Sequence, residues 1–262
     1  MAKDLEMTKK TGTLYVVATP IGNMEDITLR ALRILKEVDL IAAEDTRHTK
    51  LLLAHHGLRT PLTSLHGHNE KGKLVLILNQ LKEGKNIAYV TDAGTPCIAD
   101  PGSYLIAGAH KEKIKIVPVP GPCAAVAALS ASGFPANRFL FCGFLPSLEP
   151  KRKKYLERLR DVGEDRTIVF YESPMRILKT LKNLLEIWGD REIVLVREMT
   201  KVFEEIKRDK ISQLLKERTQ RKMKGEITVI LHAEALGPKK VSEEELTGRI
   251  KEALSKKGLS LG

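Results

Sequence analysis

The chain has 262 residues, of which 42% are hydrophobic, so it is long enough for one large globular domain or two ordinary ones. No stretch approaches the roughly 18 consecutive apolar residues that a membrane span requires, and the charged start MAKDLEMTKK lacks the apolar segment of a signal peptide. The excess of 44 lysines and arginines over 33 acidic residues gives a net charge of +11, which favours a polyanionic partner such as nucleic acid.

The first half of the chain alternates between short apolar runs and amphipathic segments. Strands are expected at 13–18, 39–44, 86–91 and 113–121, and helices at 27–38, 50–57, 73–82, 104–110 and 124–133. Asn23, with Asp26 three residues later, is a candidate N-cap for the first of these helices. Because strands and helices alternate, we predict a mostly parallel sheet covered by helices.

The second half has a different pattern, in which several connections are short enough for antiparallel neighbours. Strands are expected at 138–144, 167–173, 191–198 and 225–233, and helices at 150–160, 174–188 and 210–218. The Pro-Gly segment 118–122 is the best candidate for a domain junction. We therefore predict an α/β domain at 12–120, a second α/β domain with a mixed sheet at 121–240, and a charged helical tail at 241–262.

Three loops rich in glycine and proline follow strands of the first domain or lead out of it. Their sequences are ATPIGN, DAGTPCIADPG and PVPGPCAA. None contains a P-loop or a G-x-G-x-x-G fingerprint, and the chain has neither an H-E-x-x-H zinc motif nor a G-x-S-x-G elbow. Ligands of open α/β sheets bind beyond the carboxyl ends of the strands. A site of backbone groups and a few carboxylates suits a zwitterionic, adenosine-bearing ligand better than a polyphosphate.

No metal site is predicted, because the seven histidines are scattered and the three cysteines show no C-x-x-C spacing. Such cysteines are typical of reduced thiols in a cytoplasmic protein. Two basic runs, 151–160 and 207–224, carry six and eight basic residues. Each run is either a solvated face or a contact surface for RNA or DNA.

Six motifs, in this order and spacing, resemble one family over about residues 13 to 233. The motifs are GTLYVVATPIGNMEDITLRAL, AAEDTRHT, VTDAGTPCIADPG, VPVPGPCAAVAALSASG, FCGFLP and VFYESPMRI. Together they resemble the S-adenosylmethionine-dependent tetrapyrrole methylases, and within them the ribosomal branch of 16S rRNA (cytidine) 2′-O-ribose methyltransferases. The resemblance implies two α/β domains with the cofactor in the cleft between them, a homodimer, and the 16S rRNA of the small ribosomal subunit as substrate.

The resemblance also assigns cofactor contacts by position. The expected contacts are Pro20, Ile21, Gly22, Asp92, Gly94, Thr95, Ile98, Asp100, Gly121, Pro122, Cys123, Ala124, Phe170, Tyr171, Gly225 and Ile227. For each glycine and proline the alternative is a requirement of the turn itself. Asp100 is expected either to hydrogen-bond the cofactor or to cap a helix.

Ribose methylation requires the 2′-hydroxyl within about 3 Å of the methyl group and a route for its proton. Asp45 or Glu44, after the second strand, is the candidate base, and Arg47 is the candidate phosphate contact. The alternative is that Glu44, Asp45 and Arg47 form an ion-pair network that fixes the loop.

Four basic residues are candidates for RNA contact: Lys151, Arg152 and Lys154 of the first basic run, and Arg176. Arg176 is alternatively a partner of Glu172, four residues earlier. Three other functions remain open: methylation of a tetrapyrrole, RNA binding without catalysis, and nucleotide binding, which the missing phosphate motifs disfavour.

Overall fold

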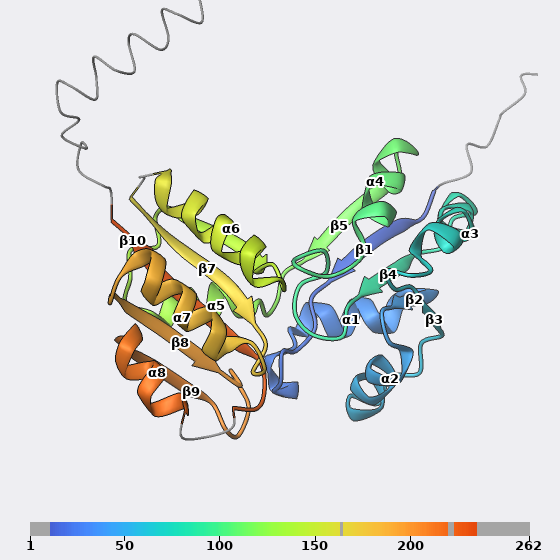
Figure 1. The fold of residues 1–262 in the computed structure, drawn as a ribbon. Helices are drawn as coiled ribbons and strands as arrows, with labels where there is room; N and C mark the ends of the chain where they lie inside the picture. The colour runs from blue at the N-terminus through green and yellow to red at the C-terminus, as the bar shows by residue number, and fades with distance from the viewer. Residues whose placement is uncertain (1–10, 163–164, 220–222, 235–262) are drawn as a thin grey trace, which may run out of the picture.

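The computed structural model describes residues 11–162, 165–219 and 223–234. Figure 1 shows two α/β domains side by side, each built on a five-stranded sheet. The first sheet has the order β3-β2-β4-β1-β5, and every neighbouring pair in it is parallel. Its strands are β1 (Thr13–Val17), β2 (Leu40–Ala43), β3 (Leu62–Ser64), β4 (Ile87–Val90) and β5 (Lys115–Val119). The predicted parallel sheet is confirmed.

Helices cover both faces of the first sheet. Its helices are α1 (Leu29–Glu37), α2 (Thr46–His55), α3 (Glu70–Lys82) and α4 (Ser103–Lys111). One buried cluster joins α1 and α2 to one face, and a second joins α3 and α4 to the other. Because β4 is buried on both faces, it is a continuous apolar run (IAYV) rather than an alternating one.

The second sheet is mixed, with the order β6-β7-β10-β8-β9. Its strands are β6 (Phe139–Phe144), β7 (Arg166–Glu172), β8 (Glu192–Arg197), β9 (Glu205–Lys210) and β10 (Ile227–Ala233). Only the pair β6–β7 is parallel, and the other three pairs are antiparallel. The predicted mixed sheet is therefore confirmed.

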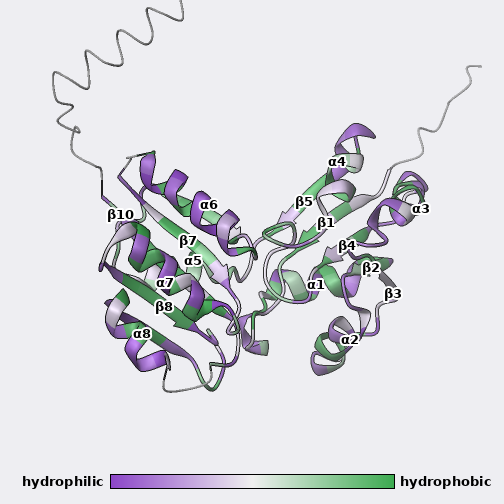
Figure 2. Cartoon of the chain, in the orientation of Figure 1, coloured by the Kyte–Doolittle hydropathy of each residue, from purple (hydrophilic) through white to green (hydrophobic). Residues whose placement is uncertain are grey.

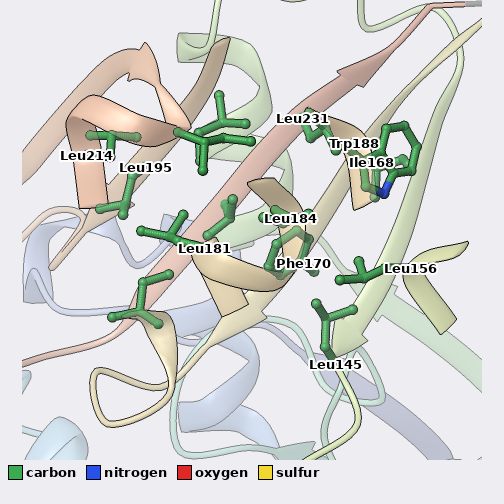
Figure 3. Close-up of a cluster of buried hydrophobic side chains, with 14 of the residues drawn as sticks. Leu145, Leu156, Ile168, Phe170, Leu181, Leu184, Trp188, Leu195, Leu214 and Leu231 are labelled. Carbon is green, nitrogen blue, oxygen red and sulfur yellow. The ribbon is translucent and has the colours of Figure 1, made fainter. Parts of the chain in front are cut away.

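The second sheet is also covered on both faces. Its helices are α5 (Ala124–Ala131), α6 (Glu149–Asp161), α7 (Ile177–Trp188) and α8 (Ile211–Thr219). Figure 3 shows the larger cluster, in which α6, α7 and α8 pack on side chains such as Phe170 and Leu195. On the opposite face α5 packs on Val169 and Val194. Helix α5 thus belongs structurally with the second sheet, although it precedes β6 in the chain.

The hydropathy pattern follows this layering. In Figure 2 the central strands are mainly hydrophobic, and the outer faces of the helices are mainly hydrophilic. Among the described residues, no helix combines the length and the apolar character that crossing a bilayer requires.

Three local features differ from the sequence expectations. Asn23 caps a short 3₁₀ helix (Met24–Asp26), and the side chain of Thr28 caps α1, so the chain forms two caps where one was predicted. Strands β3 and β9 were not predicted, because β3 has only three residues and β9 alternates charged residues at the sheet edge. The predicted division of the chain at residues 120–121 stays a prediction, and the tail at 241–262 lies outside the described residues.

Candidate active site

The main cavity, of about 400 Å³, lies between the carboxyl ends of the first sheet and the second domain. Loops after β1, β2 and β4 form one side, and β7, β8 and β10 form the other. Its lining residues are Ile21, Glu44, Asp92, Ala93, Gly94, Thr95, Ile98, Ala99, Asp100, Cys123, Ala124, Phe144, Tyr171, Glu172, Ser173, Pro174, Val196, Met199, Gly225, Glu226, Ile227 and Thr228. This volume lies within the range of about 300–1,000 Å³ that is typical of small-molecule sites.

Hydrogen bonds join the three glycine-rich loops into one wall. Thr19 and Gly94 exchange two N–H···O bonds of 2.9 and 3.0 Å, which link the first loop to the second. The Thr95 hydroxyl donates to the Pro122 carbonyl at 3.0 Å, which links the second loop to the third. Cys97 and Ala99 have φ values of 69° and 66°, a left-handed backbone that is costly for non-glycine residues and concentrates at functional sites.

Four carboxylates other than Glu172 line this cavity: Glu44, Asp92, Asp100 and Glu226. Burial and the neighbouring carboxylates raise the pKa of Asp100 to about 6. Burial is also the main cause that raises the pKa of Glu44 above its ordinary value. None of the described lining residues is a lysine, arginine or histidine. The cavity is therefore acidic inside a protein of net charge +11 and suits a cationic ligand.

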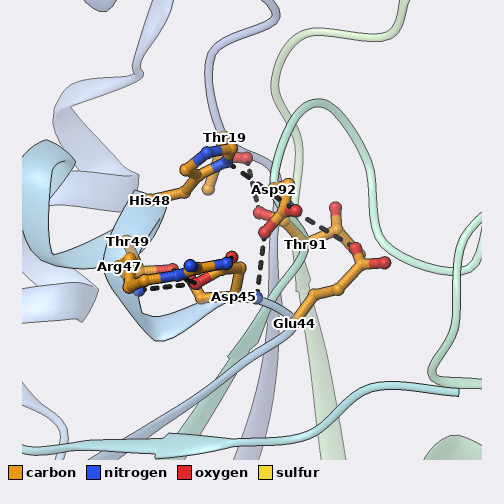
Figure 4. Close-up of polar contacts among 8 residues, drawn as sticks. All are labelled: Thr19, Glu44, Asp45, Arg47, His48, Thr49, Thr91 and Asp92. Carbon is orange, nitrogen blue, oxygen red and sulfur yellow. Dashed lines mark hydrogen bonds and ion pairs between the residues drawn. The ribbon is translucent and has the colours of Figure 1, made fainter. Parts of the chain in front are cut away.

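Figure 4 shows how the acidic residues after β2 and β4 are connected. The Asp92 carboxylate accepts from the Asp45 backbone N–H at 2.9 Å, and the Asp92 N–H donates to the Glu44 carboxylate at 3.4 Å. His48 Nδ1 lies 3.7 Å from the other Asp92 oxygen. Asp92 thus connects Glu44 with the start of α2.

Asp45 has a different role from Glu44 in this geometry. Its side chain caps α2 by accepting from the Arg47 N–H at 2.8 Å, and it pairs with the Arg47 guanidinium at 2.5 Å. These bonds from Arg47 hold the pKa of Asp45 well below its ordinary value. A carboxylate held in this way is a weak proton acceptor, and Asp45 does not line the main cavity. The ion-pair alternative describes Asp45 and Arg47, whereas Glu44 faces the cavity.

Most of the predicted cofactor contacts come together around the main cavity. The eleven that line it are Ile21, Asp92, Gly94, Thr95, Ile98, Asp100, Cys123, Ala124, Tyr171, Gly225 and Ile227. Asp100 lies in the cavity wall, and the residue at the N-cap position of α4 is Gly102. Whether these eleven contact a cofactor stays a prediction.

The other five predicted contacts lie elsewhere. Pro20 and Gly22 line a neighbouring cavity, and Pro122 is the partner of Thr95. A Cβ on Gly121 would lie 2.9 Å from the Ala18 Cβ, so close packing against Ala18 requires glycine there. The prediction for Phe170 is corrected, because it is 0% exposed and packs under α6–α8. Successive side chains of a strand point to opposite faces, so Tyr171 faces the cavity and Phe170 does not.

The neighbouring cavity, which we call the side cavity, has a volume of about 320 Å³. It lies beside the first loop and the start of α2, with Lys201 and Glu226 on the side of the second domain. It shares Ile21, Asp92, Ala93 and Glu226 with the main cavity. The two cavities are therefore adjacent and separated by few residues.

The predicted RNA contacts divide into exposed and buried residues. Lys151 and Lys154 are exposed on α6. The prediction for Arg152 is corrected, because this residue is 1% exposed and donates to the Asn183 side chain at 2.9 Å. Arg176 pairs with Glu172 at 2.6 Å, which is the alternative interpretation from the sequence.

Several cavity residues were not identified from the sequence. Phe144 is the last residue of β6 and Met199 follows β8, and both reach the cavity only through the folding of the second domain. Glu226 lies between the predicted contacts Gly225 and Ile227, so this segment was predicted but its carboxylate was not. No group of three or more metal-ligating side chains occurs in the part of the chain that the structure describes.

A family model described as Tetrapyrrole (Corrin/Porphyrin) Methylases matches residues 13–215, most of the chain. The chain belongs to this family. The resemblance predicted from the six motifs is thereby confirmed, and the family's name describes methylases, which makes this chain a member of an enzyme family.

Within the tetrapyrrole methylases, several curated relatives carry the name ribosomal RNA small subunit methyltransferase I. The Haemophilus influenzae protein is 48% identical over 252 residues, which cover 95% of this chain and 87% of the relative. The Escherichia coli O157:H7 protein is 47% identical, covering 90% of this chain and 81% of the relative. The Thermotoga maritima protein is 49% identical, covering 84% and 98%. The chain therefore belongs to this ribosomal RNA group of the tetrapyrrole methylases.

Solved structures of more distant proteins share the fold. A cobalt precorrin-4 methyltransferase is 20% identical, with a TM-score of 0.63 over 86% of this chain and 96% of the other. A uroporphyrin-III C-methyltransferase from Thermus thermophilus, solved with S-adenyl homocysteine, is 19% identical, with a TM-score of 0.57 over 84% and 97%. At this identity the likeness shows the fold of the tetrapyrrole methylases and nothing about substrate.

Proposed function

We propose that this tetrapyrrole methylase transfers a methyl group from S-adenosylmethionine to the 2′-hydroxyl of a cytidine in the 16S rRNA of the small ribosomal subunit. The observation that carries the proposal is the identity of 47–49%, over 84–95% of the chain, with proteins named ribosomal RNA small subunit methyltransferase I. The chemistry of the main cavity supports the cofactor, and the charge of the chain supports the substrate.

The donor set of the main cavity fits S-adenosylmethionine. The molecule carries a sulfonium, an α-ammonium and one carboxylate, so its net charge is positive, and it presents ribose hydroxyl and ammonium donors. Asp92, Asp100 and Glu226 are carboxylate acceptors in the cavity wall. Charge-assisted hydrogen bonds of this kind are about twice as strong as neutral ones. A polyphosphate would be repelled by the same wall.

The aromatic and apolar residues of the cavity suit the rest of the cofactor. Tyr171 is held in place because its hydroxyl oxygen accepts from the Ala125 N–H at 3.1 Å, and Phe144 stands 5.6 Å from its ring centroid. Ile21 and Ile98 present apolar surface from the first domain. These side chains would hold the adenine and the methionine chain while excluding water.

Glu44 is the proposed base. When bound, the cofactor supplies a methyl group on a sulfonium that is ready for in-line displacement. Glu44 lies in the cavity wall with a raised pKa, so it would receive the proton of the 2′-hydroxyl when the methyl carbon passes from the sulfur to that oxygen. Asp92 fixes Glu44 through its backbone N–H. Arg47, whose side chain is 87% exposed, lies at the start of α2 and has N–H groups left to contact a phosphate.

The exposed face of α6 is the proposed RNA-docking surface. Lys151, Lys154 and Arg158 are exposed there at helical spacing, and none forms an ion pair with a described residue. By contrast, Lys207, Arg208 and Arg218 of the second basic run pair with Glu217, Glu192 and Glu205. We therefore assign phosphate contact to α6 and an internal structural role to Lys207, Arg208 and Arg218.

The assembly and compartment are part of the proposal. We propose a homodimer, which the exposed apolar side chains Leu29, Met175 and Val202 support as candidates for burial. Light scattering coupled to gel filtration measures the dimer directly. The three free cysteines support the cytoplasm as compartment.

The decisive experiment is methyl transfer from labelled S-adenosylmethionine to three substrates side by side: small ribosomal subunits, naked 16S rRNA and a tetrapyrrole panel. We expect label in the RNA at an alkali-resistant dinucleotide, which identifies 2′-O-methylation. Label in a tetrapyrrole alone would overturn the RNA assignment. Cofactor and RNA binding without any transfer would favour a binding protein without catalysis.

A further inference from the structure

The loop at residues 92–102 joins β4 to α4 and forms much of the wall of the main cavity. In its first half, Gly94 and Thr95 bond to the other two glycine-rich loops. Within the described chain, the hydrogen bond of residues 96–101 runs only from the Ile98 N–H to the Thr95 carbonyl. The second half of the loop is therefore held by packing and by its C-terminal end, where α4 begins.

This second half has a strained backbone. Cys97 and Ala99 have φ values of 69° and 66°, and Gly102 has a φ of 120°. A left-handed backbone at non-glycine residues persists only where the surrounding structure over-determines it. The strained segment leads directly into Ser103, the first residue of α4. The place of the α4 N-terminus therefore determines whether the loop keeps its shape.

Helix α4 has no room for an N-terminal cap of its own. The first free N–H groups of a helix are usually satisfied by a Ser, Thr, Asp or Asn side chain at the N-cap position. In α4 this position is Gly102, and a Cβ there would overlap the ring of Tyr89. Because no side chain fits at residue 102, the acceptor has to come from another element.

Glu70, the first residue of α3, is that acceptor. Its Oε1 accepts from the N–H of Leu105, the third residue of α4, at 2.9 Å. Glu70 is only 3% exposed, although glutamate is seldom buried. A carboxylate at a helix N-terminus is favoured by the helix dipole, which offsets part of the cost of burial. A buried carboxylate from α3 thus replaces the local cap of α4.

The start of α3 is itself fixed and lies beside the loop. The Asn69 side-chain oxygen accepts from the His66 N–H at 2.9 Å, which closes the turn before Glu70. A Cβ on Gly67 would lie 3.9 Å from the Pro101 Cγ, an ordinary van der Waals distance. This turn is therefore a neighbour of the strained segment, and Glu70 extends from a fixed point.

We propose that Glu70 is a positioning residue for S-adenosylmethionine, which caps α4 and thereby holds residues 97–102 in the shape that lines the main cavity. Glu70 does not line the cavity itself, so it acts through Leu105 and the loop. The inference rests on the proposed placement of the cofactor in the main cavity. It does not depend on the RNA substrate.

Three variants separate the hydrogen bond of Glu70 from its charge and from general stability. Glu70→Leu keeps most of the side-chain volume and removes the acceptor. Glu70→Gln also removes the charge but keeps an oxygen that accepts from Leu105. Leu78→Ala weakens the packing of α3 on Gly108, in the second half of α4, and leaves the cap in place.

Calorimetry on the full chain gives the Kd for S-adenosylmethionine. We expect this Kd to rise at least tenfold in Glu70→Leu and to stay within threefold of wild type in Glu70→Gln and Leu78→Ala. An unchanged Kd in Glu70→Leu would overturn the inference. So would an equal rise in Glu70→Gln, which would assign the effect to charge, or in Leu78→Ala, which would assign it to stability. Wild-type protein that binds no S-adenosylmethionine would instead overturn the proposed function.

Hydrogen exchange tests the same coupling in the wild-type protein, even if Glu70→Leu does not fold. If the bond between Glu70 and Leu105 strengthens cofactor binding, the cofactor must strengthen that bond by the same free energy. We expect S-adenosylmethionine to slow exchange of the Leu105 N–H at least fivefold in wild type and Glu70→Gln, but not in Glu70→Leu. Unchanged exchange in cofactor-bound wild type would overturn the inference even where RNA is methylated. Slowed exchange in a protein that methylates no RNA would support it.

Discussion

At the scale of single residues, the environments of Glu44 and Asp45 differ although they are adjacent in the chain. Asp45 caps α2 and is paired with Arg47, whereas Glu44 lines the cavity with a raised pKa. We therefore predict that Glu44→Gln lowers kcat by about 100- to 10,000-fold, the usual contribution of a general base, with the Kd for S-adenosylmethionine within a few-fold of wild type. Asp45→Asn is the matched control, because Asn also caps helices. This variant should lower kcat by less than tenfold.

The same assignment predicts a pH profile. Protonated Glu44 accepts no proton, so kcat should rise with pH through the raised pKa of Glu44 and then level off. Glu44→Gln should lose this acidic limb while keeping a low, pH-independent rate. If kcat of Glu44→Gln still rose with pH as in wild type, and kcat of Asp45→Asn did not, the base would be Asp45 and not Glu44.

Asp100 provides a second prediction, on stability. Burial raises the pKa of Asp100 from 3.8 to about 6, so the folded protein holds this proton more tightly than the unfolded chain does. Between these two pKa values the folded state binds more protons, so its stability falls as the pH rises, and the full penalty is present above pH 6. Asp100→Asn should therefore stabilise the protein at pH 7.5 by about 1 kcal/mol, after allowance for solvent screening.

Denaturant unfolding without cofactor at pH 7.5 and pH 4.5 checks this linkage. The increase in the free energy of unfolding from Asp100→Asn should be largest at pH 7.5. It should be mostly absent at pH 4.5, because at that pH Asp100 is protonated in the folded wild type. The same variant should bind S-adenosylmethionine more weakly at pH 7.5, since a carboxylate acceptor is lost. A gain of equal size at both pH values would mean that the Asp100 pKa is not raised.

At the scale of elements, the end of β7 and the start of α7 are joined by a buried ion pair. The Glu172 side chain is 0% exposed and accepts from Arg176 at 2.7 Å and from the Thr180 hydroxyl at 2.6 Å. Removing one partner of such a pair typically costs about 3–5 kcal/mol, because the other charge stays buried. We predict that Arg176→Ala lowers the free energy of unfolding by about that amount.

The control for Arg176 is Lys154→Ala, which removes an exposed charge from α6. This variant should change stability by less than about 0.5 kcal/mol and weaken RNA binding instead. Thermal unfolding and RNA binding are measured on both variants. If Arg176→Ala kept wild-type stability and lost only RNA affinity, the sequence-based assignment of Arg176 to RNA would be restored.

The family, the helices and all strands except β3 and β9 could be predicted from the sequence because their signals are local. The run IAYV predicts a buried parallel strand, and the loop ATPIGN follows its strand directly. The role of Arg152 could not be predicted, because its partner Asn183 lies on another helix, 31 residues away. A basic run indicates a charged helix, but only the packing of α6 on α7 determines that Arg152 is the residue that turns inward.

Gly22, the glycine of the first loop, shows the same limit of prediction from sequence. Gly22 was assigned to the cofactor, but a Cβ there would lie 2.4 Å from the Lys201 Cγ, in the second domain. The sequence indicates that a glycine is required, whereas the reason is an approach between segments nearly 180 residues apart. The sequence therefore predicted the position of the site more reliably than the role of each residue in it.

At the scale of the whole molecule, the close contact of Gly22 with Lys201 couples the two domains. Gly22→Ala must displace the Lys201 side chain and with it the pairs to Glu198 and Glu226. We predict that Gly22→Ala lowers the free energy of unfolding by about 1–3 kcal/mol in the wild-type background and by less in the Lys201→Ala background. The double-mutant cycle gives the coupling directly by denaturant unfolding, and additive losses would show that the two residues do not interact.

The charge distribution leads to the last prediction. Lys151 and Lys154 are exposed and unpaired among the described residues, whereas Lys207 and Arg208 pair with Glu217 and Glu192. A cation that neutralises a phosphate releases a counterion, so each such contact steepens the fall of RNA affinity with salt by about 0.7–0.9 in a double-logarithmic plot. Lys151→Ala/Lys154→Ala should therefore reduce this slope by about 1.5.

The matched control, Lys207→Ala/Arg208→Ala, removes the same formal charge from the chain. If only net charge mattered, both double variants would lower RNA affinity and slope equally. If phosphate contact is made by α6, the control should leave the slope nearly unchanged, because its cations already neutralise internal carboxylates. Binding of small ribosomal subunits, measured from about 50 to 300 mM salt, separates the two cases. Equal slopes for both variants would remove α6 as the specific docking surface and leave a general attraction between a basic protein and RNA.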